Sequence, residues 1–131
     1  MTLIDAERLT WQAVCRLDAL IPGRGVAALV EGTAVAVFRL DDADSVRAID
    51  NLDPCSGASV LSRGLTGQTD LGEGPVRYVA SPIRKQRFDL DTGRCLDVDV
   101  AVATWAARVV DGVVEVAREA SPPSNGPETT P

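Results

Sequence analysis

The segment WAARVVDGVVEV, residues 105–116, constrains the fold of this chain more than any other feature. Asp-Gly between two short apolar runs is the favoured two-residue turn between antiparallel strands, because both residues tolerate a left-handed backbone. Counting outward from the turn predicts three cross-strand pairs: Val110 with Val113, Val109 with Val114, and Arg108 with Glu115. The charged pair predicts an ion pair on the wetter face of the hairpin, and the apolar residues share the other face with Trp105.

Short Val- and Ala-rich runs, separated by Gly, Pro, Asp and Asn, continue this strand pattern along the chain, and helix signals are weak. Gly32 is expected to turn a tight hairpin whose second arm, residues 34–40, is apolar on both faces and therefore central in a sheet. Further strands are expected at residues 11–15, 26–30, 45–50, 76–81 and 87–90. Seven to nine short antiparallel strands predict an all-β sandwich or a barrel-like pair of sheets.

The length of 131 residues, with 45% hydrophobic and 24% charged residues, predicts one folded domain. Residues 1–10 are interpreted as a lead-in and residues 11–118 as the domain. Residues 119–131 are expected to form a disordered tail, because four of the eight prolines fall in the last ten residues and no apolar side chain follows Ala120. The tail is either simply solvated or an arm that touches a partner.

Several partner classes are disfavoured by the composition. The formal charge of −6 repels nucleic-acid phosphates, so no nucleic-acid partner is expected. Apolar runs of a few residues are far shorter than the roughly 20 needed to span a bilayer, so no membrane segment is expected. The start MTLIDAERLT has no signal-peptide pattern, and three widely spaced cysteines do not suggest a disulfide framework. These features predict a cytoplasmic protein with reduced thiols.

Histidine is absent from the whole chain, which removes the commonest metal ligand and the commonest general base. A Ser–His or Cys–His nucleophile pair is therefore impossible within it. The numerous aspartates, such as Asp41 and Asp89, are interpreted as solvated turn residues. The glycine-rich segment SRGLTGQTDLGEG, residues 62–74, lacks the Gly-Lys-Ser/Thr ending of a phosphate-binding loop and is interpreted as a surface loop. No active site is expected.

Two loops carry the most specific information: NLDPCSGASVLSRG (the first loop, residues 51–64) and SPIRKQRFDLDTG (the second loop, residues 81–93). Together with WQAVC, GVAALVEG, VAVFRL and VVDGVVEV, these motifs make residues 11–116 resemble the Rieske-like small subunits of assimilatory NAD(P)H-dependent nitrite reductases. The resemblance implies a Rieske-like β-sandwich with a smaller loop-bearing subdomain at about residues 50–93.

The resemblance also implies where a Rieske cluster would be held. Rieske proteins bind a [2Fe–2S] cluster with two Cys and two His, and these positions fall on Asp53 and Cys55 in the first loop and on Ser81 and Arg84 in the second. Arg offers only donors, and Ser and Asp are hard ligands, so the cluster site is expected to be degenerate. An ion pair between Asp53 and Arg84, with Ser81 bonding a loop amide, is expected in its place.

The cysteines leave two interpretations open. Cys55 is expected near an arginine of the second loop. It is either an exposed redox thiol with a lowered pKa or a small buried hydrophobic residue, and the second interpretation is favoured. Cys15 and Cys95 are interpreted as packing residues.

The resemblance implies a function in nitrogen assimilation: a small, cofactor-free, non-catalytic subunit that binds and shapes a catalytic large subunit reducing nitrite to ammonium. Siroheme, [4Fe–4S], FAD and NAD(P)H are then expected on the large subunit. The expected partner surface comprises Arg63, Arg84, Lys85, Gln86 and the turn at residues 53–57. The basic cluster of Arg84, Lys85 and Arg87, which overlaps this surface, is equally interpreted as a solvated strand edge. The alternatives are a Rieske-type [2Fe–2S] electron-transfer ferredoxin and a stand-alone Rieske-like adaptor.

Overall fold

The computed structural model describes residues 10–41 and 45–121 and shows an all-β fold of two antiparallel sheets, as predicted. Two short 3₁₀ turns, η1 and η2, are the helical elements of this part of the chain. The elements in chain order are β1 (Trp11–Arg16), η1 (Leu17–Ala19), β2 (Gly25–Val30), β3 (Thr33–Arg39), β4 (Val46–Asp50), η2 (Leu61–Arg63), β5 (Leu65–Asp70), β6 (Pro75–Ala80), β7 (Arg87–Asp89), β8 (Thr104–Val110) and β9 (Val113–Ser121).

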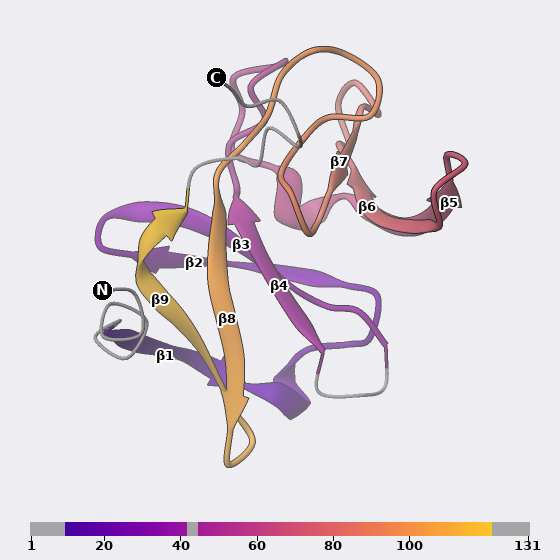
Figure 1. The fold of residues 1–131 in the computed structure, drawn as a ribbon. Helices are drawn as coiled ribbons and strands as arrows, with labels where there is room; N and C mark the ends of the chain where they lie inside the picture. Colours follow the sequence, from indigo (N-terminus) through magenta and orange to yellow (C-terminus); the bar gives the residue numbers. More distant parts are fainter. Residues whose placement is uncertain (1–9, 42–44, 122–131) are drawn as a thin grey trace, which may run out of the picture.

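The larger sheet has six strands in the order β1-β9-β8-β4-β3-β2 (Figure 1). The expectation that residues 34–40 form an interior strand is confirmed, because β3 pairs with β2 on one side and with β4 on the other. Four consecutive residues at the centre of β3, from Val35 to Phe38, are fully buried. This strand therefore contributes side chains to the core on both faces of the sheet.

Two hairpins fix the register of the larger sheet. All three pairs predicted around Asp111–Gly112 are present, and the Nε atom of Arg108 lies 2.8 Å from a carboxylate oxygen of Glu115. Both turn residues have positive φ, 52° and 78°, as a two-residue hairpin turn requires. The hairpin expected at Gly32 uses the same geometry, with φ of 50° at Glu31 and 83° at Gly32.

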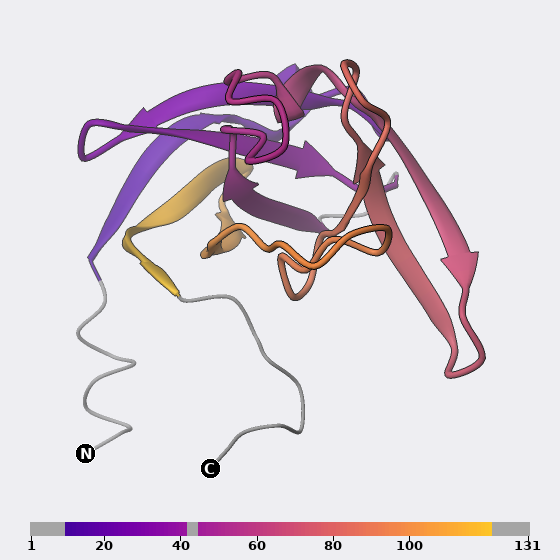
Figure 2. The ribbon, with the colours of Figure 1, turned by 90° about the horizontal axis from the view of Figure 1, so that it is seen from above.

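The larger sheet is curled, and its two edge strands approach each other. The Nε2 atom of Gln12 in β1 donates a hydrogen bond of 2.8 Å to the carbonyl oxygen of Leu29 in β2. Arg118 of β9 forms an ion pair of 2.8 Å with Glu31 at the β2–β3 turn. Figure 2 shows the curvature that brings these strands together. β1 and β2 are the two edges of the sheet and are not paired through their backbones, so side chains connect them.

The smaller sheet has the order β5-β6-β7, and the β5–β6 hairpin extends away from the larger sheet (Figures 1 and 2). The strand β5 corrects the interpretation of residues 62–74 as a plain loop, because Leu65–Asp70 pairs with β6 over six residues. The turn that follows is a surface turn, in which the Asp70 carboxylate accepts the amides of Gly72 and Gly74. A bound phosphate would need these same amide donors, which already bond the Asp70 carboxylate.

Two hydrophobic clusters hold the fold together. One fills the curled sheet and includes Leu20, Val35, Trp105 and Val114. The second joins the two sheets, because it combines Phe38 and Ile49 of the larger sheet with Val79 and Phe88 of the smaller one, all fully buried. The loop-bearing part of the chain therefore shares its core with the larger sheet.

The last strand extends beyond the predicted end of the domain. β9 continues to Ser121, so its strand runs into the segment expected as a tail, and residues 122–131 lie outside the described residues, as do residues 1–9 of the lead-in. Within the described ranges, no helix is long and apolar enough to cross a membrane.

Candidate functional site

The first and second loops meet at one end of the molecule, beyond the end of β4 (Figure 1). In the first loop, Asp53 anchors a turn: its carbonyl oxygen accepts the Gly57 amide at 2.8 Å and its own amide donates to the Ala58 carbonyl at 2.8 Å. The second loop begins with a similar turn, in which the Ser81 amide donates to the Gln86 carbonyl and the Lys85 amide donates to the Ser81 carbonyl, both at 2.9 Å. Asp53 and Ser81 are thereby fixed in space.

A buried hydrogen bond joins the two loops. The Ser81 hydroxyl donates to Oδ2 of Asp53 at 2.6 Å, and both residues are almost fully buried, with exposures of 1% and 0%. The other carboxylate oxygen, Oδ1, accepts the Cys55 amide at 2.9 Å. The Ser81 oxygen in turn accepts the Ile83 amide at 3.2 Å, so the expectation that Ser81 bonds a loop amide is confirmed. A short hydrogen bond to a carboxylate is among the stronger neutral-to-charged contacts in proteins.

The ion pair expected between Asp53 and Arg84 is wrong. None of the ion pairs between described residues joins these two side chains, and Arg84 is exposed whereas Asp53 is buried. The physical reason is burial: a guanidinium would lose much of its hydration beside Asp53, whereas the small Ser81 hydroxyl reaches the carboxylate inside the fold. The contact between the loops is therefore carboxylate to hydroxyl.

Hydrogen bonds decide the ionisation of Asp53. Burial of the carboxyl raises its pKa, but the donated hydrogen bonds from Ser81, Cys55 and Ser56 together outweigh burial and leave the pKa of Asp53 lowered. The carboxylate is therefore charged at neutral pH, and it is balanced by hydrogen-bond donors and not by a cation.

Cys55 does not have the environment of a reactive thiol. Burial, followed by the nearby negative groups of Asp53 and Cys95, raises the pKa of Cys55, and only Arg84 opposes them. The expectation of a lowered pKa for the Cys55 thiol is thus wrong. Cys55 and Cys95 pack against the core cluster between the sheets and Cys15 packs inside the curled sheet, as expected of packing residues.

The four degenerate ligand positions do not fit a [2Fe–2S] cluster. Asp53 and Ser81, at the two cysteine positions, are hydrogen-bonded to each other, and neither offers a soft donor. Of the two histidine positions, Arg84 has donors only, and Cys55 is the single soft donor among the four positions. Across the described ranges, no group of three His, Cys, Asp or Glu residues is placed to hold a metal ion.

The other expected site residues lie around the second loop. Arg63 in η2 and Lys85 are exposed, and Lys85 has a positive φ of 65°. Gln86 is half-buried, and its Oε1 atom is buried without a hydrogen-bond partner. The charge of Arg87 is neutralised within the chain, because its guanidinium forms an ion pair of 2.8 Å with Asp97.

Sequence reasoning missed Arg24 and Leu65. Arg24 lies far from the loops in sequence, yet it lines one hollow together with Arg63 and Leu65. No local pattern marks it, because its position depends on the turn before β2 packing beside η2, where the Thr66 hydroxyl donates to the Gly23 carbonyl at 2.7 Å. Leu65 is 74% exposed and lies in the strand that the sequence did not reveal.

Comparisons with known proteins agree with this architecture. Residues 10–117 match the family described as the Rieske-like [2Fe-2S] domain. The chain is 49% identical to a nitrite reductase (NADH) small subunit of Salmonella typhimurium, over 81% of this chain and 95% of the relative. It is 50% identical to a crystal structure described as an NADH-dependent nitrite reductase small subunit from Mycobacterium tuberculosis, with a TM-score of 0.76 and coverage of 85% and 96%.

A third relative has a different organisation. The chain is 44% identical to a segment of the nitrite reductase [NAD(P)H] large subunit of Klebsiella oxytoca. The match covers 83% of this chain but only 11% of that protein. A domain similar to the whole described fold is therefore part of a large-subunit polypeptide in that organism.

Proposed function

The chain belongs to the Rieske-like [2Fe-2S] domain family, and from that premise we propose that it is the small subunit of an NAD(P)H-dependent nitrite reductase that binds and shapes the catalytic large subunit. Its named relatives at 45–50% identity are small subunits of such enzymes. The reaction is the six-electron reduction of nitrite to ammonium with a nicotinamide as the electron source.

The buried hydrogen bond between Asp53 and Ser81 carries the non-redox part of this proposal. A contact made entirely of protein atoms holds the two loops at the positions where a cluster would otherwise hold them. The chain then contributes shape and surface to the reductase, and the electron-transfer groups belong to the large subunit. These groups are siroheme, a [4Fe–4S] cluster, FAD and the NAD(P)H site.

The Klebsiella oxytoca relative supports the large subunit as the partner, since a domain similar to this chain occurs there within a large-subunit polypeptide. Two polypeptides that are fused in one organism commonly function side by side when they are separate. On this proposal both subunits work in the cytoplasm, where the three free thiols stay reduced.

The proposed contact surface lies at the end of the molecule that carries the two loops. It comprises Arg63, Arg84, Lys85, Gln86 and the turn at residues 53–57. Arg63, Arg84 and Lys85 are exposed cations that form no ion pair with the described acidic residues, although the chain has a net charge of −6. Gln86 follows these cations in the second loop and is half-buried.

Co-expression with the large subunit tests this function. We expect the two chains to co-purify, and adding the small subunit to be required for full nitrite-dependent NAD(P)H oxidation. The double variant Arg84→Glu with Lys85→Glu is expected to weaken co-purification, because it reverses two exposed charges of the contact surface.

Two results would contradict the proposal. A brown small subunit with stoichiometric iron and inorganic sulfide would identify an electron-transfer ferredoxin. A small subunit that neither binds the large subunit nor changes nitrite reduction would be a stand-alone adaptor.

A further inference from the structure

Two hollows border each other beside the N-terminal end of β5, and both are lined by Arg63, Gly64 and Leu65. The first has a volume of about 210 Å³ and is completed by Ala80, Ser81, Pro82 and Lys85. The second has a volume of about 320 Å³ and is completed by Arg24, Gly25 and Ser62. We call the two hollows together the Leu65 groove. It is built from both sheets, because Arg24 precedes β2 and Lys85 lies between β6 and β7.

The charge of the Leu65 groove is one-sided. Arg24, Arg63 and Lys85 line it, whereas no Asp or Glu does. None of the ion pairs found between described residues includes any of these three cations, although the chain carries nineteen acidic and thirteen basic residues. Cations left unpaired in an acidic protein attract a negatively charged partner over several ångströms.

The apolar part of the Leu65 groove is equally distinct. Leu65 is 74% exposed, the highest exposure among the large hydrophobic residues described, and it shares the groove with Pro82 and Ala80. Gly64 keeps this part of β5 close to β6, since a Cβ atom at that position would lie 2.2 Å from the Ala80 carbonyl oxygen. The apolar surface formed by Leu65, Ala80 and Pro82 therefore lies on two closely packed segments of backbone.

Lys85 occupies a position whose backbone conformation favours glycine. Its φ of 65° falls in the left-handed region, which costs an ordinary residue conformational energy. Strain of this kind is more often found at binding sites than elsewhere. The position keeps a cation at the rim of the Leu65 groove despite that cost.

We propose that the Leu65 groove binds an acidic segment of the nitrite reductase large subunit that carries an apolar side chain, which packs on Leu65 while its carboxylates pair with Arg24, Arg63 and Lys85. This inference rests on the proposed function, because it assigns the large subunit as the occupant. It extends the contact surface past the loops to Arg24 on the larger sheet. The three cations supply long-range attraction and Leu65 supplies the apolar contact.

Binding of the purified holo large subunit to small-subunit variants tests the proposal. The double variant Arg24→Glu with Arg63→Glu is expected to bind at least about tenfold more weakly and to show a smaller dependence of affinity on salt. Leu65→Ser is expected to weaken binding without changing the salt dependence. Lys85→Gly is expected to weaken binding while the melting temperature does not fall, because glycine removes the left-handed strain.

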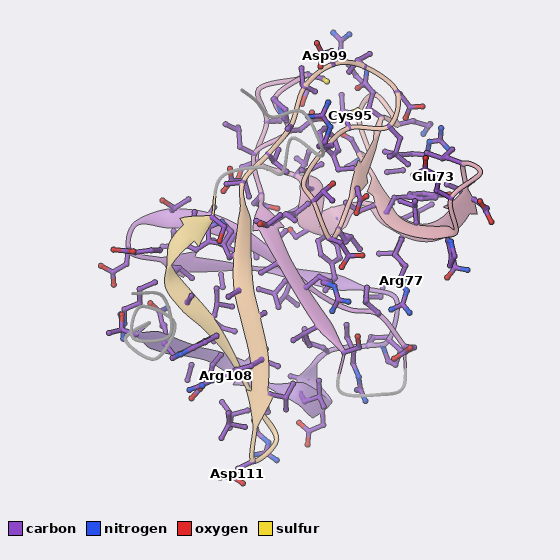
Figure 3. All side chains as sticks on the ribbon, viewed as in Figure 1. Glu73, Arg77, Cys95, Asp99, Arg108 and Asp111 are labelled. Carbon is purple, nitrogen blue, oxygen red and sulfur yellow. The ribbon has the colours of Figure 1, made fainter. Side chains whose placement is uncertain are left out.

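Arg16→Glu is the control, and it is matched in charge to the single variant Arg24→Glu, which is measured beside it. Arg16 is also exposed, but it lies in β1, where its backbone pairs with that of Val113 beside the β8–β9 turn. Its side chain forms an ion pair with Asp18. Figure 3 shows Asp111 of that turn and Glu73 of the β5–β6 turn in well-separated parts of the molecule. The control is expected to bind like the wild type.

The outcomes separate the two proposals. Wild-type affinity in the double variant and in Leu65→Ser, with weakened binding in Arg84→Glu alone, would refute the groove and leave the proposed function standing. Absence of any binding by the wild-type small subunit would refute both. Equal weakening by Arg16→Glu and by Arg24→Glu would show that the loss follows from net charge alone, and it would also refute the groove.

Discussion

At the scale of single residues, one hydrogen bond between Asp53 and Ser81 takes the place that metal coordination has in Rieske proteins. The carboxylate is fully buried and charged, so its stability depends on the donors around it. The donors are small: one hydroxyl and nearby amides of the first loop. A local arrangement of this kind leaves the arginine at the fourth ligand position free to face the solvent.

Removing the Ser81 hydroxyl tests this contact. Ser81→Ala is expected to lower the free energy of unfolding by about 1.5–3 kcal/mol at neutral pH, because it takes a hydrogen bond from a buried carboxylate. Urea unfolding followed by tryptophan fluorescence measures the change. Ser121→Ala, at an exposed serine whose side chain joins none of the described hydrogen bonds, is the control and is expected to have little effect.

The effect of Ser81→Ala is expected to depend on pH with a definite sign. The folded-state pKa of Asp53 is below the ordinary value of 3.8, so the contribution is complete above that value and is lost as the pH falls through the lower folded-state pKa. The difference between wild type and variant should therefore shrink in acid. A difference that grew on acidification would show that Asp53 is neutral in the folded protein.

At the scale of secondary-structure elements, local patterns predicted some strands and missed another. The β8–β9 hairpin was predictable because Asp111–Gly112 encodes the turn and the alternation of residues encodes the register. β5 was missed because LTGQTD lacks the β-branched apolar pattern of a strand, and it is extended only because β6 pairs with it. The loop pair was predictable as a motif, whereas the choice of Ser81 over Arg84 as the partner of Asp53 depends on burial, which sequence does not display.

Gly64 is expected to be essential to the β5–β6 pairing. Gly64→Ala should destabilise the protein by about 1–3 kcal/mol, because its Cβ would lie 2.2 Å from a backbone oxygen that cannot move away alone. Gly67→Ala, at a glycine inside β5, is the control. Its Cβ would meet the hydroxyl end of Tyr78, which can rotate aside, so a change within about 1 kcal/mol is expected. Thermal unfolding of both variants checks the difference, and equal losses would contradict it.

At the scale of the whole molecule, the shared core makes the two sheets one cooperative unit. Phe38 and Ile49 from the larger sheet pack with Val79 and Phe88 from the smaller one. Both tryptophans, Trp11 and Trp105, belong to the larger sheet and report its unfolding. Damage in the smaller sheet should therefore be detected in the larger one.

Phe88→Ala tests this coupling. It is expected to reduce the free energy of unfolding by about 3–5 kcal/mol, because it removes a fully buried aromatic side chain. The loss should be visible in the urea midpoint of tryptophan fluorescence. Val110→Ala, at a residue that is 40% exposed, is the control and should shift the midpoint much less. A Phe88→Ala protein with an unchanged tryptophan midpoint would mean that the two sheets unfold separately.

The carboxylate-to-hydroxyl contact between the loops also affects how such a subunit matures. A chain whose loops are closed by its own side chains needs no assembly machinery to deliver iron and inorganic sulfide before it is finished. We therefore expect the chain to accumulate during iron starvation, since none of the described residues is grouped to hold a metal ion. On the proposed function, supply of the holoenzyme would then depend on the maturation of the large subunit alone.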